Sequence, residues 1–285
     1  MSRRDHTHFS LSILTRLAGP AAPAAILGLL MPCFATSASA TPTTTWDLYQ
    51  NCAQIVGSGS ACIGSGSGAT NGNVYQFTSA TSPSLSLTAS AYHSSTNQSL
   101  GSASFLGEYT GSQYGLGVEN LSAPEHAVDN QSGDDFIVFA LPTGTNFDKL
   151  QISLSPFGTT EDMNASIFYG TPTAALGIGT TPSASAFSNL SINNLLADGF
   201  SEVTTTNLLN KSSIQTINIT SPSIINYVIV AADLTPGRHE TDYFKVNAIT
   251  AIDTPPANVP EPASLALFAA GLVGLRTLRR RKAIA

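Results

Sequence analysis

Short apolar runs alternate with turn-forming residues along the central part of the chain. Residues 84–91 alternate polar and apolar side chains at period two, which predicts a strand with one apolar and one polar face. Residues 136–141 are continuously apolar, as expected of a strand that is buried on both faces. Further strands are predicted at residues 74–77, 150–154, 166–169, 214–219, 227–232 and 243–252.

Glycine, asparagine and proline clusters separate these runs, and no long amphipathic helix interrupts them. Many short strands with regular turn signals predict an all-β fold, specifically a jelly-roll-like β-sandwich that spans residues 41–253. A short helix is predicted at residues 187–196, with Leu190, Leu195 and Leu196 on one side.

Charge is scarce and unevenly distributed. Only 11% of the 285 residues are charged, and eight of the twelve basic residues lie in the end segments. The body keeps four basic and sixteen acidic residues, a formal charge of −12. Nucleic-acid binding requires a basic surface that neutralises phosphates, so this class is excluded.

The N-terminal segment has the three parts of a secretory signal peptide. Arg3 and Arg4 precede the apolar residues 21–34, and small residues follow up to Ala40. We therefore predict that residues 1–40 are a signal peptide that directs the chain through the Sec translocon, and that signal peptidase cleaves between Ala40 and Thr41. A retained membrane anchor is the alternative, but the apolar run is short and interrupted by prolines.

The C-terminal segment is also tripartite. A proline-rich spacer at residues 254–259 leads into Pro260-Glu261-Pro262, and an apolar run follows at residues 263–275. A basic cluster then ends the tail: Arg279, Arg280, Arg281 and Lys282. The apolar run predicts a short transmembrane helix in the inner membrane, with the basic cluster as a cytoplasmic stop. The run is shorter than the roughly 20 residues of a comfortable span, which favours a transient anchor.

The order of these three parts resembles the PEP-CTERM sorting signal. The resemblance covers residues 260–285 and implies that Pro260, Glu261 and Pro262 form the motif that the processing enzyme exosortase recognises. It further implies a Gram-negative bacterium, often one that makes exopolysaccharide. The expected location is therefore the cell surface or the extracellular matrix, and an unprocessed tail anchor is the alternative.

Two cysteines, Cys52 and Cys62, remain in the body once the leader is removed. Because export implies an oxidising compartment, we predict a disulfide bond between them across a Gly/Ser loop. The alternative is a pair of free thiols.

Five oxygen-bearing residues precede or open the apolar run at residues 136–141. Calcium prefers such ligands, so a calcium site is one prediction for Glu125, Asp129, Asn130, Asp134 and Asp135. The spacing does not match an EF-hand loop. The alternative is structural: an Asx-turn at Asp129 and Asn130, and solvated acids at Asp134 and Asp135 that prevent edge pairing.

Aromatic residues are frequent in the first half of the body: Trp46, Tyr49, Tyr75, Tyr92, Tyr109 and Tyr114. Such rings bind sugars where polar groups surround them, and otherwise they fill the core. Catalysis finds little support, because no nucleophile elbow or phosphate-binding loop is present. A secreted glycoside hydrolase with Glu161 or Asp162 as one of two carboxylates is the weakest alternative, since Asp162 is expected in a solvated turn.

These patterns together predict an exported surface or matrix protein with a structural or adhesive role and no catalytic activity. The alternative is a carbohydrate- or calcium-binding module at the same location, and exopolysaccharide is the candidate partner. No cofactor other than calcium is expected.

Overall fold

The computed structural model describes most of the body of the chain. The described residues are 42–50, 52–56, 71–81, 83–95, 99–109, 114–120, 123–131, 133–157, 162–173, 186–205, 213–235 and 241–253. The leader and the C-terminal tail, with the signal cleavage site, the sorting motif and the basic cluster, lie outside the described residues.

The described residues form antiparallel strands and one short helix, which confirms the all-β prediction. The first eight strands are β1 (Thr43–Asp47), β2 (Cys52–Val56), β3 (Val74–Thr78), β4 (Ser86–Ser94), β5 (Ser102–Tyr109), β6 (Gly115–Asn120), β7 (Ala123–Asp129) and β8 (Asp134–Ala140). The remaining elements are β9 (Phe147–Pro156), β10 (Ala165–Gly170), α1 (Ile192–Ala197), β11 (Ser201–Thr204), β12 (Gln215–Thr220), β13 (Tyr227–Ala232) and β14 (Tyr243–Asp253).

The strands build two layers that share one strand. In one layer, β4, β8, β13 and β10 pair side by side, with β3 and β2 beyond β4 and β11 beyond β10. In the other, β14 pairs with β1, β6, β7 and β9, and β12 pairs with β9. Strand β5 belongs to both layers, because Ser102–Ser104 pair with β4 whereas Phe105–Tyr109 pair with β6.

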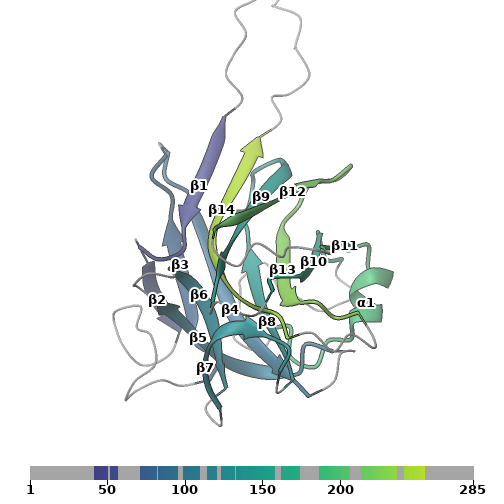
Figure 1. Cartoon of the computed structure of the whole chain (residues 1–285). Helices are drawn as coiled ribbons and strands as arrows, with labels where there is room; N and C mark the ends of the chain where they lie inside the picture. Colours follow the sequence, from purple (N-terminus) through teal and green to yellow (C-terminus); the bar gives the residue numbers. More distant parts are fainter. Residues whose placement is uncertain are drawn as a thin grey trace, which may run out of the picture. The chain divides into compact units, whose positions relative to one another are not determined.

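Strands β1 and β14 lie side by side, so both ends of the body leave it at the same place (Figure 1). Thr43 pairs with Ile252, and the backbone N–H of Asp253 donates to Pro42 O over 3.0 Å. We call this the exit end. The opposite end, where β14 begins at Tyr243, we call the far end. The eleven residues of β14 separate the two ends by roughly 33 Å.

The main core fills the space between the layers. Both layers supply fully buried side chains to it, including Ile137 and Phe139 from β8 and Phe244 and Val246 from β14. At the exit end, Trp46 packs edge-on against Phe147, with ring centroids 6.1 Å apart. The Trp46 Nε1–H donates to Leu85 O over 2.9 Å, so this buried indole has its polar atom satisfied.

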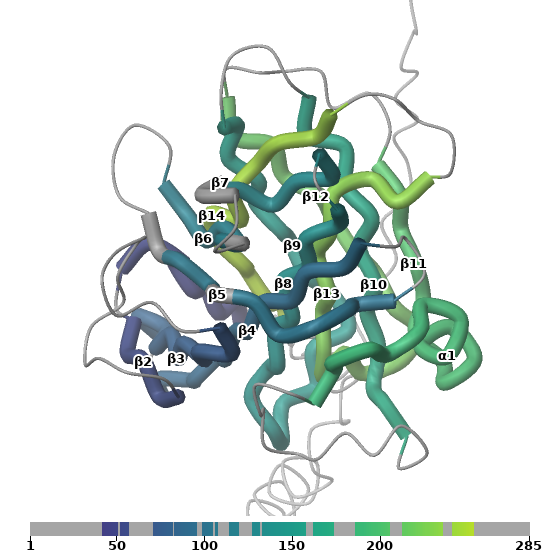
Figure 2. Tube along the Cα trace, turned by 90° about the horizontal axis from the view of Figure 1, so that it is seen from below, coloured from purple at the N-terminus to yellow at the C-terminus, as the bar shows by residue number. Residues whose placement is uncertain are grey.

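A second apolar cluster covers the outer face of the β4–β8–β13–β10 layer. The other residues of β8, Phe136 and Val138, belong to this cluster together with Phe187 and Leu195 from the segment around α1. Figure 2 shows α1 beside β11 at the side of this layer. Strand β8 is therefore buried on both faces, and all seven of its residues are buried, as its continuous apolar run predicts.

The same covering segment changes the environment of β4. The apolar face is confirmed, since Leu87, Ala89 and Ala91 join the main core. The polar residues Thr88 and Ser90 are buried as well, at 8% and 5% exposure, although the alternation indicates an ordinary polar face. The helix is shorter than predicted, and it buries Leu195 while Leu196 is 37% exposed.

None of the helices among the described residues is long and apolar enough to cross a bilayer. The apolar run at residues 263–275 lies outside that part of the chain, so the transmembrane helix stays a prediction.

Candidate functional site

Six aspartates lie at the far end of the body, and all six are buried. They stand at the ends of strands, where the chain turns back between apolar runs: Asp129, Asp134, Asp135, Asp162, Asp233 and Asp242. All are at most 6% exposed. Buried carboxyl groups are unfavourable unless hydrogen bonds or a proton compensate them, so their partners decide what this end can do.

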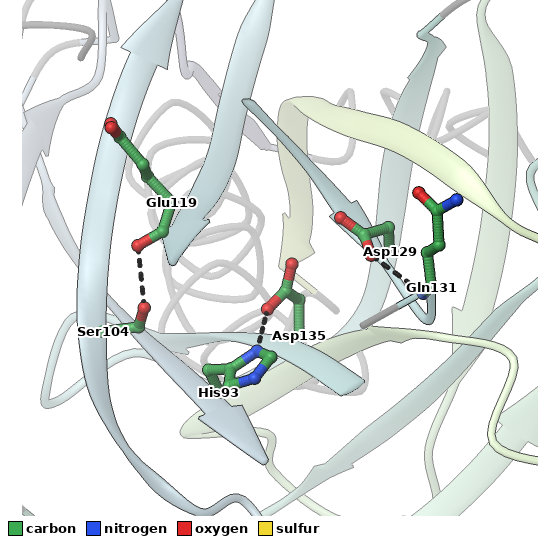
Figure 3. A network of polar contacts seen from close by, with 6 residues as sticks. All are labelled: His93, Ser104, Glu119, Asp129, Gln131 and Asp135. Atoms are coloured by element: carbon green, nitrogen blue, oxygen red, sulfur yellow. Dashed lines mark hydrogen bonds and ion pairs between the residues drawn. The ribbon is translucent and has the colours of Figure 1, made fainter. Parts of the chain in front are cut away.

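The first group, which we call the His93 cluster, consists of His93, Asp129, Asp134 and Asp135. Figure 3 shows three of them, His93, Asp129 and Asp135. His93 and Asp135 lie opposite each other on β4 and β8, and His93 Nδ1 is 2.9 Å from Asp135 Oδ1. The His93 side chain is 20% exposed and that of Asp135 only 5%. The contact is a hydrogen bond with neutral histidine and an ion pair with protonated histidine.

Glycine at position 133 permits this arrangement. Its φ angle is +138°, and an added Cβ would lie 2.4 Å from Ser94 O and 2.7 Å from the His93 ring. Any larger residue would therefore displace the imidazole from its place beside β8.

Burial governs the protonation of the carboxyl groups in this cluster. Desolvation, with the neighbouring Asp135 charge, raises the pKa of Asp134 to about 6. Desolvation also raises the pKa of Asp135, although its hydrogen bond to His93 opposes the change. The cluster thus holds more protons near pH 6 than solvated aspartates would.

The structural alternative for these residues is confirmed for Asp129 and contradicted for Asp134 and Asp135. Asp129 Oδ1 accepts a hydrogen bond from the backbone N–H of Gln131 over 2.9 Å, which is the expected Asx-turn. Asp134 and Asp135, however, are not solvated acids at a sheet edge. They belong to β8, which pairs with β4 on one side and β13 on the other, and they are 6% and 4% exposed.

The second group, which we call the three-aspartate cluster, consists of Asp162, Asp233 and Asp242. A bridge pairs Asp162 with Asp242, and the backbone N–H of Tyr243 donates to Asp162 O over 3.0 Å. Asn164 donates to both carboxylates: its backbone N–H to Asp242 Oδ1 and its Nδ2 to Asp162 Oδ2, each over 3.0 Å.

Asn130 completes the surroundings of this second group. Its Oδ1 accepts from the backbone N–H of Asp242, and its Nδ2 donates to Asp242 Oδ2, each over 3.0 Å. The same Nδ2 lies 3.3 Å from Asp233 O. The Asx-turn at Asp129 and Asn130 therefore reaches both clusters.

The pKa of Asp242 is the most displaced of this group. Burial, with the adjacent carboxyl group of Asp162, raises the pKa of Asp242 to about 8. The backbone hydrogen bond from Asn164 opposes this change and the charge of Asp233 adds to it. At neutral pH Asp242 is therefore largely protonated where its carboxyl group meets that of Asp162. The two groups touch, which leaves no room between them for the glycosidic bond that a hydrolase would hold there.

The predicted calcium ligands are divided between the clusters. Asp129, Asp134 and Asp135 lie in the His93 cluster, whereas the Asn130 side chain points to Asp242 and Asp233. Glu125 lies in β7, and its side chain is not described. In the described part of the chain, no three His, Cys, Asp or Glu side chains converge as metal ligands.

The aromatic residues separate into core and surface. Trp46, Tyr75 and Tyr92 are fully buried, and the side chain of Tyr109 is not described. Tyr114 is 44% exposed and Tyr49 is partly buried, with ring centroids 5.1 Å apart and planes tilted by 35°. Of the five rings whose side chains the structure describes, only this pair is placed to meet a ligand from solution.

Cys52 lies in β2, opposite Phe77, and packs against the main core. Its predicted partner Cys62 lies outside the described residues, so the Cys52–Cys62 disulfide bond stays a prediction.

The exit end carries a groove, whereas the far end carries the buried aspartates. A groove of about 490 Å³ is lined by Pro42, Thr43, Thr44, Thr81, Pro83, Leu85, Thr145, Phe147 and Asp253. Its walls are mostly threonine, proline and apolar side chains, and it adjoins the point where β14 ends.

The described body thus defines an all-β protein whose first and last strands leave together. The segment beyond its last strand is what relates the chain to known proteins: residues 258–282 match the family model of the PEP-CTERM protein-sorting motif. This confirms the resemblance: the chain carries a PEP-CTERM protein-sorting motif at residues 258–282. The motif marks it as an exported protein that exosortase sorts to the cell surface. No curated protein matches the chain.

Sequence reasoning missed the three-aspartate cluster. A usable signal existed for two of its members, because Asp233 and Asp242 lie directly beside the strands predicted at residues 227–232 and 243–252, whereas Asp162 lies four residues before the strand predicted at residues 166–169. An acid directly beside a buried strand is itself a candidate for burial. The expectation of a solvated turn at Asp162 is wrong, since Asp162 is 6% exposed.

Proposed function

We propose that this chain is a structural or adhesive protein of the cell surface or extracellular matrix, with a jelly-roll-like β-sandwich as its displayed body. The pairing of β1 with β14 carries the proposal, because it puts both ends of the body at one place. A tail that begins after Asp253 therefore holds the body by the exit end and presents the far end to the surroundings. This orientation follows from the topology wherever the chain beyond Asp253 stays attached to the surface.

Processing of the tail is tested by mass spectrometry of the C-terminus of the exported chain. We expect the native product to lack the basic cluster, and Glu261→Gln to retain residues up to Ala285. Glu202→Gln is the matched control, since Glu202 is an exposed residue of β11. A native product that keeps Ala285 would exclude cleavage and leave the tail as a permanent anchor.

The structural role is tested in the producing cells. Deletion of the chain should weaken cell–cell or cell–surface attachment, and the full chain should restore it. Glu261→Gln should restore attachment poorly, because the body stays at the inner membrane. Normal attachment in the deletion strain would contradict an adhesive role.

A carbohydrate-binding module is the second candidate, and the Tyr49–Tyr114 pair supports it. Tilted neighbouring rings with one exposed face suit stacking on a sugar. Asn247 Nδ2 donates to Tyr114 O over 3.3 Å and so fixes the backbone that carries the exposed ring.

We expect Tyr114→Ala to weaken binding to the exopolysaccharide of the producing cells by about tenfold, which corresponds to about 1.4 kcal/mol. Tyr114→Phe is the control and should bind normally, because stacking needs the ring and not the hydroxyl. If Tyr114→Ala and Tyr114→Phe bound the exopolysaccharide equally well, the carbohydrate-binding candidate would be rejected.

A further inference from the structure

Strand β12 is a sheet edge without the features that normally prevent a further strand from pairing with it. It pairs with β9 in a register that runs without a bulge from Gln215 opposite Leu154 to Thr220 opposite Lys149. No other strand of the described residues pairs with its second side. Exposed edges are normally blocked by charged side chains, by proline or by bulges. Residues 215–220 contain no charged residue and no proline, so nothing in the strand itself opposes a further strand.

The surroundings of β12 are free of acids, although the body has a formal charge of −12. Thr216, Asn218 and Thr220 form the exposed outer face of the strand. Their partners on β9 are a serine, a glutamine and a lysine. Acidic bodies repel one another over a Debye length of about 8 Å at physiological salt. An acid-free edge is therefore a place where two copies of this chain can approach each other.

The order of side chains in β12 is self-complementary. Residues that lie directly opposite each other in an antiparallel pair point to the same face. When two copies of β12 pair around Asn218, Ile217 of one copy lies opposite Ile219 of the other, and Thr216 lies opposite Thr220. Ile217 and Ile219 belong to the main core, so the buried faces of the two copies continue each other. Pairs of β-branched residues and of threonines are favourable in this arrangement.

The centre and the ends of this pair also match. Asn218 lies opposite the same residue of the second copy, and a carboxamide can both donate to and accept from its counterpart. Gln151 Nε2 donates to Asn218 Oδ1 over 3.0 Å, which holds this side chain on the outer face. Beyond the strand, Ile214 is 52% exposed and would lie opposite Pro222 of the second copy. The pair would thus cover an exposed apolar side chain at each end.

We propose that β12 pairs antiparallel with β12 of a second copy of this chain, and that this contact joins copies held by two different surfaces. The inference rests on the proposed adhesive role and names its partner. Strand β9 is antiparallel to both β12 and β14, so β12 and β14 run in the same direction. Antiparallel pairing of β12 therefore turns the two β14 strands in opposite directions, and the two exit ends point to opposite surfaces.

The position of the contact leaves room for both surfaces. Asn218 lies opposite Gln151, which in turn lies opposite Thr250, three residues before β14 ends at Asp253. At about 3.3 Å per residue, the far end of each body extends roughly 13 Å past the exit end of the other. The spacer at residues 254–259 can reach at most roughly 20 Å. This reach is enough to keep each far end clear of the opposite surface.

A single contact of this kind is weak. One added strand buries less than the roughly 1,200 Å² of a stable complex. Many copies on two facing surfaces bind together, however, and such multivalency raises the overall affinity by about 10²–10⁴-fold. The contact therefore has to be tested both between chains in solution and between surfaces.

The register is tested by disulfide formation in the full chain, exported and purified as the cell processes it. Asn218→Cys should give covalent dimers on a non-reducing gel under mild oxidation, because residue 218 faces itself. Thr216→Cys is the matched control and should stay monomeric. Two copies of residue 216 lie roughly 13 Å apart along the strands, beyond the limit of about 7 Å between the Cα atoms of a disulfide. Equal dimer yields from the two variants, or no dimer from Asn218→Cys, would overturn the proposal.

The orientation is tested with beads that carry the full chain by its C-terminal residue. Beads with the native chain should cluster, and soluble native chain should inhibit the clustering. Asn218→Lys places two like charges opposite each other and should reduce clustering about tenfold. Thr204→Lys adds the same charge at an exposed position of β11, another sheet edge, and should cluster as the native chain does. The proposal is wrong if native beads stay dispersed or if both lysine variants lose clustering equally.

These results are separable from the proposed function. If the deletion strain loses attachment and Asn218→Lys restores it fully, the chain is adhesive through another contact and the β12 pairing is rejected. If the deletion strain attaches normally while native beads cluster through β12, the pairing is supported and the adhesive role is rejected. Asn218 is exposed, so Asn218→Lys should melt at the native temperature. If it does not fold, the two cysteine variants decide without it.

Discussion

The two ends of the body are buried by different means. At the exit end, Trp46 and Phe147 pack edge to face, and the strands that leave the body pair directly with each other. At the far end, the buried groups are six aspartates whose stability depends on hydrogen bonds and protons. Apolar packing responds little to pH or ions, whereas buried acids respond to both. The stability of the exit end should therefore change little with pH, whereas that of the far end should change with it.

Trp46→Ala should have the largest effect, because it removes the principal packing contact of the exit end. Truncation of a fully buried Trp costs about 3–5 kcal/mol of unfolding free energy, measured by urea denaturation. Trp46→Phe should cost less, since a ring still packs against Phe147 while only the bond to Leu85 O is lost. A loss below about 1 kcal/mol for Trp46→Ala would mean that apolar packing does not hold this end.

Cys62→Ser tests the predicted disulfide bond, which also constrains the exit-end half of the main core through Cys52. Closing a loop of this length stabilises a chain by about 2–3 kcal/mol. We expect Cys62→Ser to lose that amount, and reductant to destabilise the native chain equally without affecting the variant. A native chain that carries two free thiols by mass spectrometry would contradict the prediction.

The far end should make stability depend on pH. The pKa of Asp242 is about 8 in the folded chain against 3.8 ordinarily, so the folded state binds more protons between these values. Stability is then greatest at low pH and is lost as pH rises through this window, by up to about 1.4 kcal/mol per unit. We expect a loss of about 2 kcal/mol between pH 5 and 7 in EDTA.

Asp242→Asn should reduce this dependence, and the part that remains up to about pH 6 comes from Asp134, whose pKa burial raises to about 6. Lys245 does not interfere, because burial lowers its pKa only to about 8 and it is protonated in both states below that pH. A native chain whose stability rises from pH 5 to 7 would refute the protonated pair.

The smallest effect concerns the bond between His93 and Asp135. A double-mutant cycle with His93→Ala and Asp135→Asn should give a coupling energy of about 1 kcal/mol in unfolding experiments. The same cycle with His93 and Glu202, an exposed residue of β11, should give none. Zero coupling in the first cycle would mean that other contacts hold the buried carboxylate.

The strands were largely predictable because the local order of apolar and polar residues indicates which side chains are buried. The continuous run that becomes β8 identified a strand buried on both faces without any knowledge of its neighbours. The alternation in β4 was less informative. Thr88 and Ser90 are buried because the segment around α1, about a hundred residues later, covers that layer, and no local pattern contains this information.

For the far end, the kinds of residues were predictable from the sequence, but the contacts between their side chains were not. The sequence places acids beside apolar runs, yet Asn130 and Asp242 are 112 residues apart and meet only because β7 and β14 pair at their ends. His93 and Asp135 meet through the register of β4 on β8. Such contacts depend on topology, which is why one calcium ligand set was predicted, whereas the four members whose side chains are described lie in two clusters.

The side-by-side departure of the first and last strands has a mechanical consequence. A pull on the tail acts along the axis of β14, which is bonded to β1 on one side and to β9 on the other. The load is then shared in shear by many backbone bonds at once and does not open them one after another. A body held in this way can resist drag at the cell surface without a separate stalk.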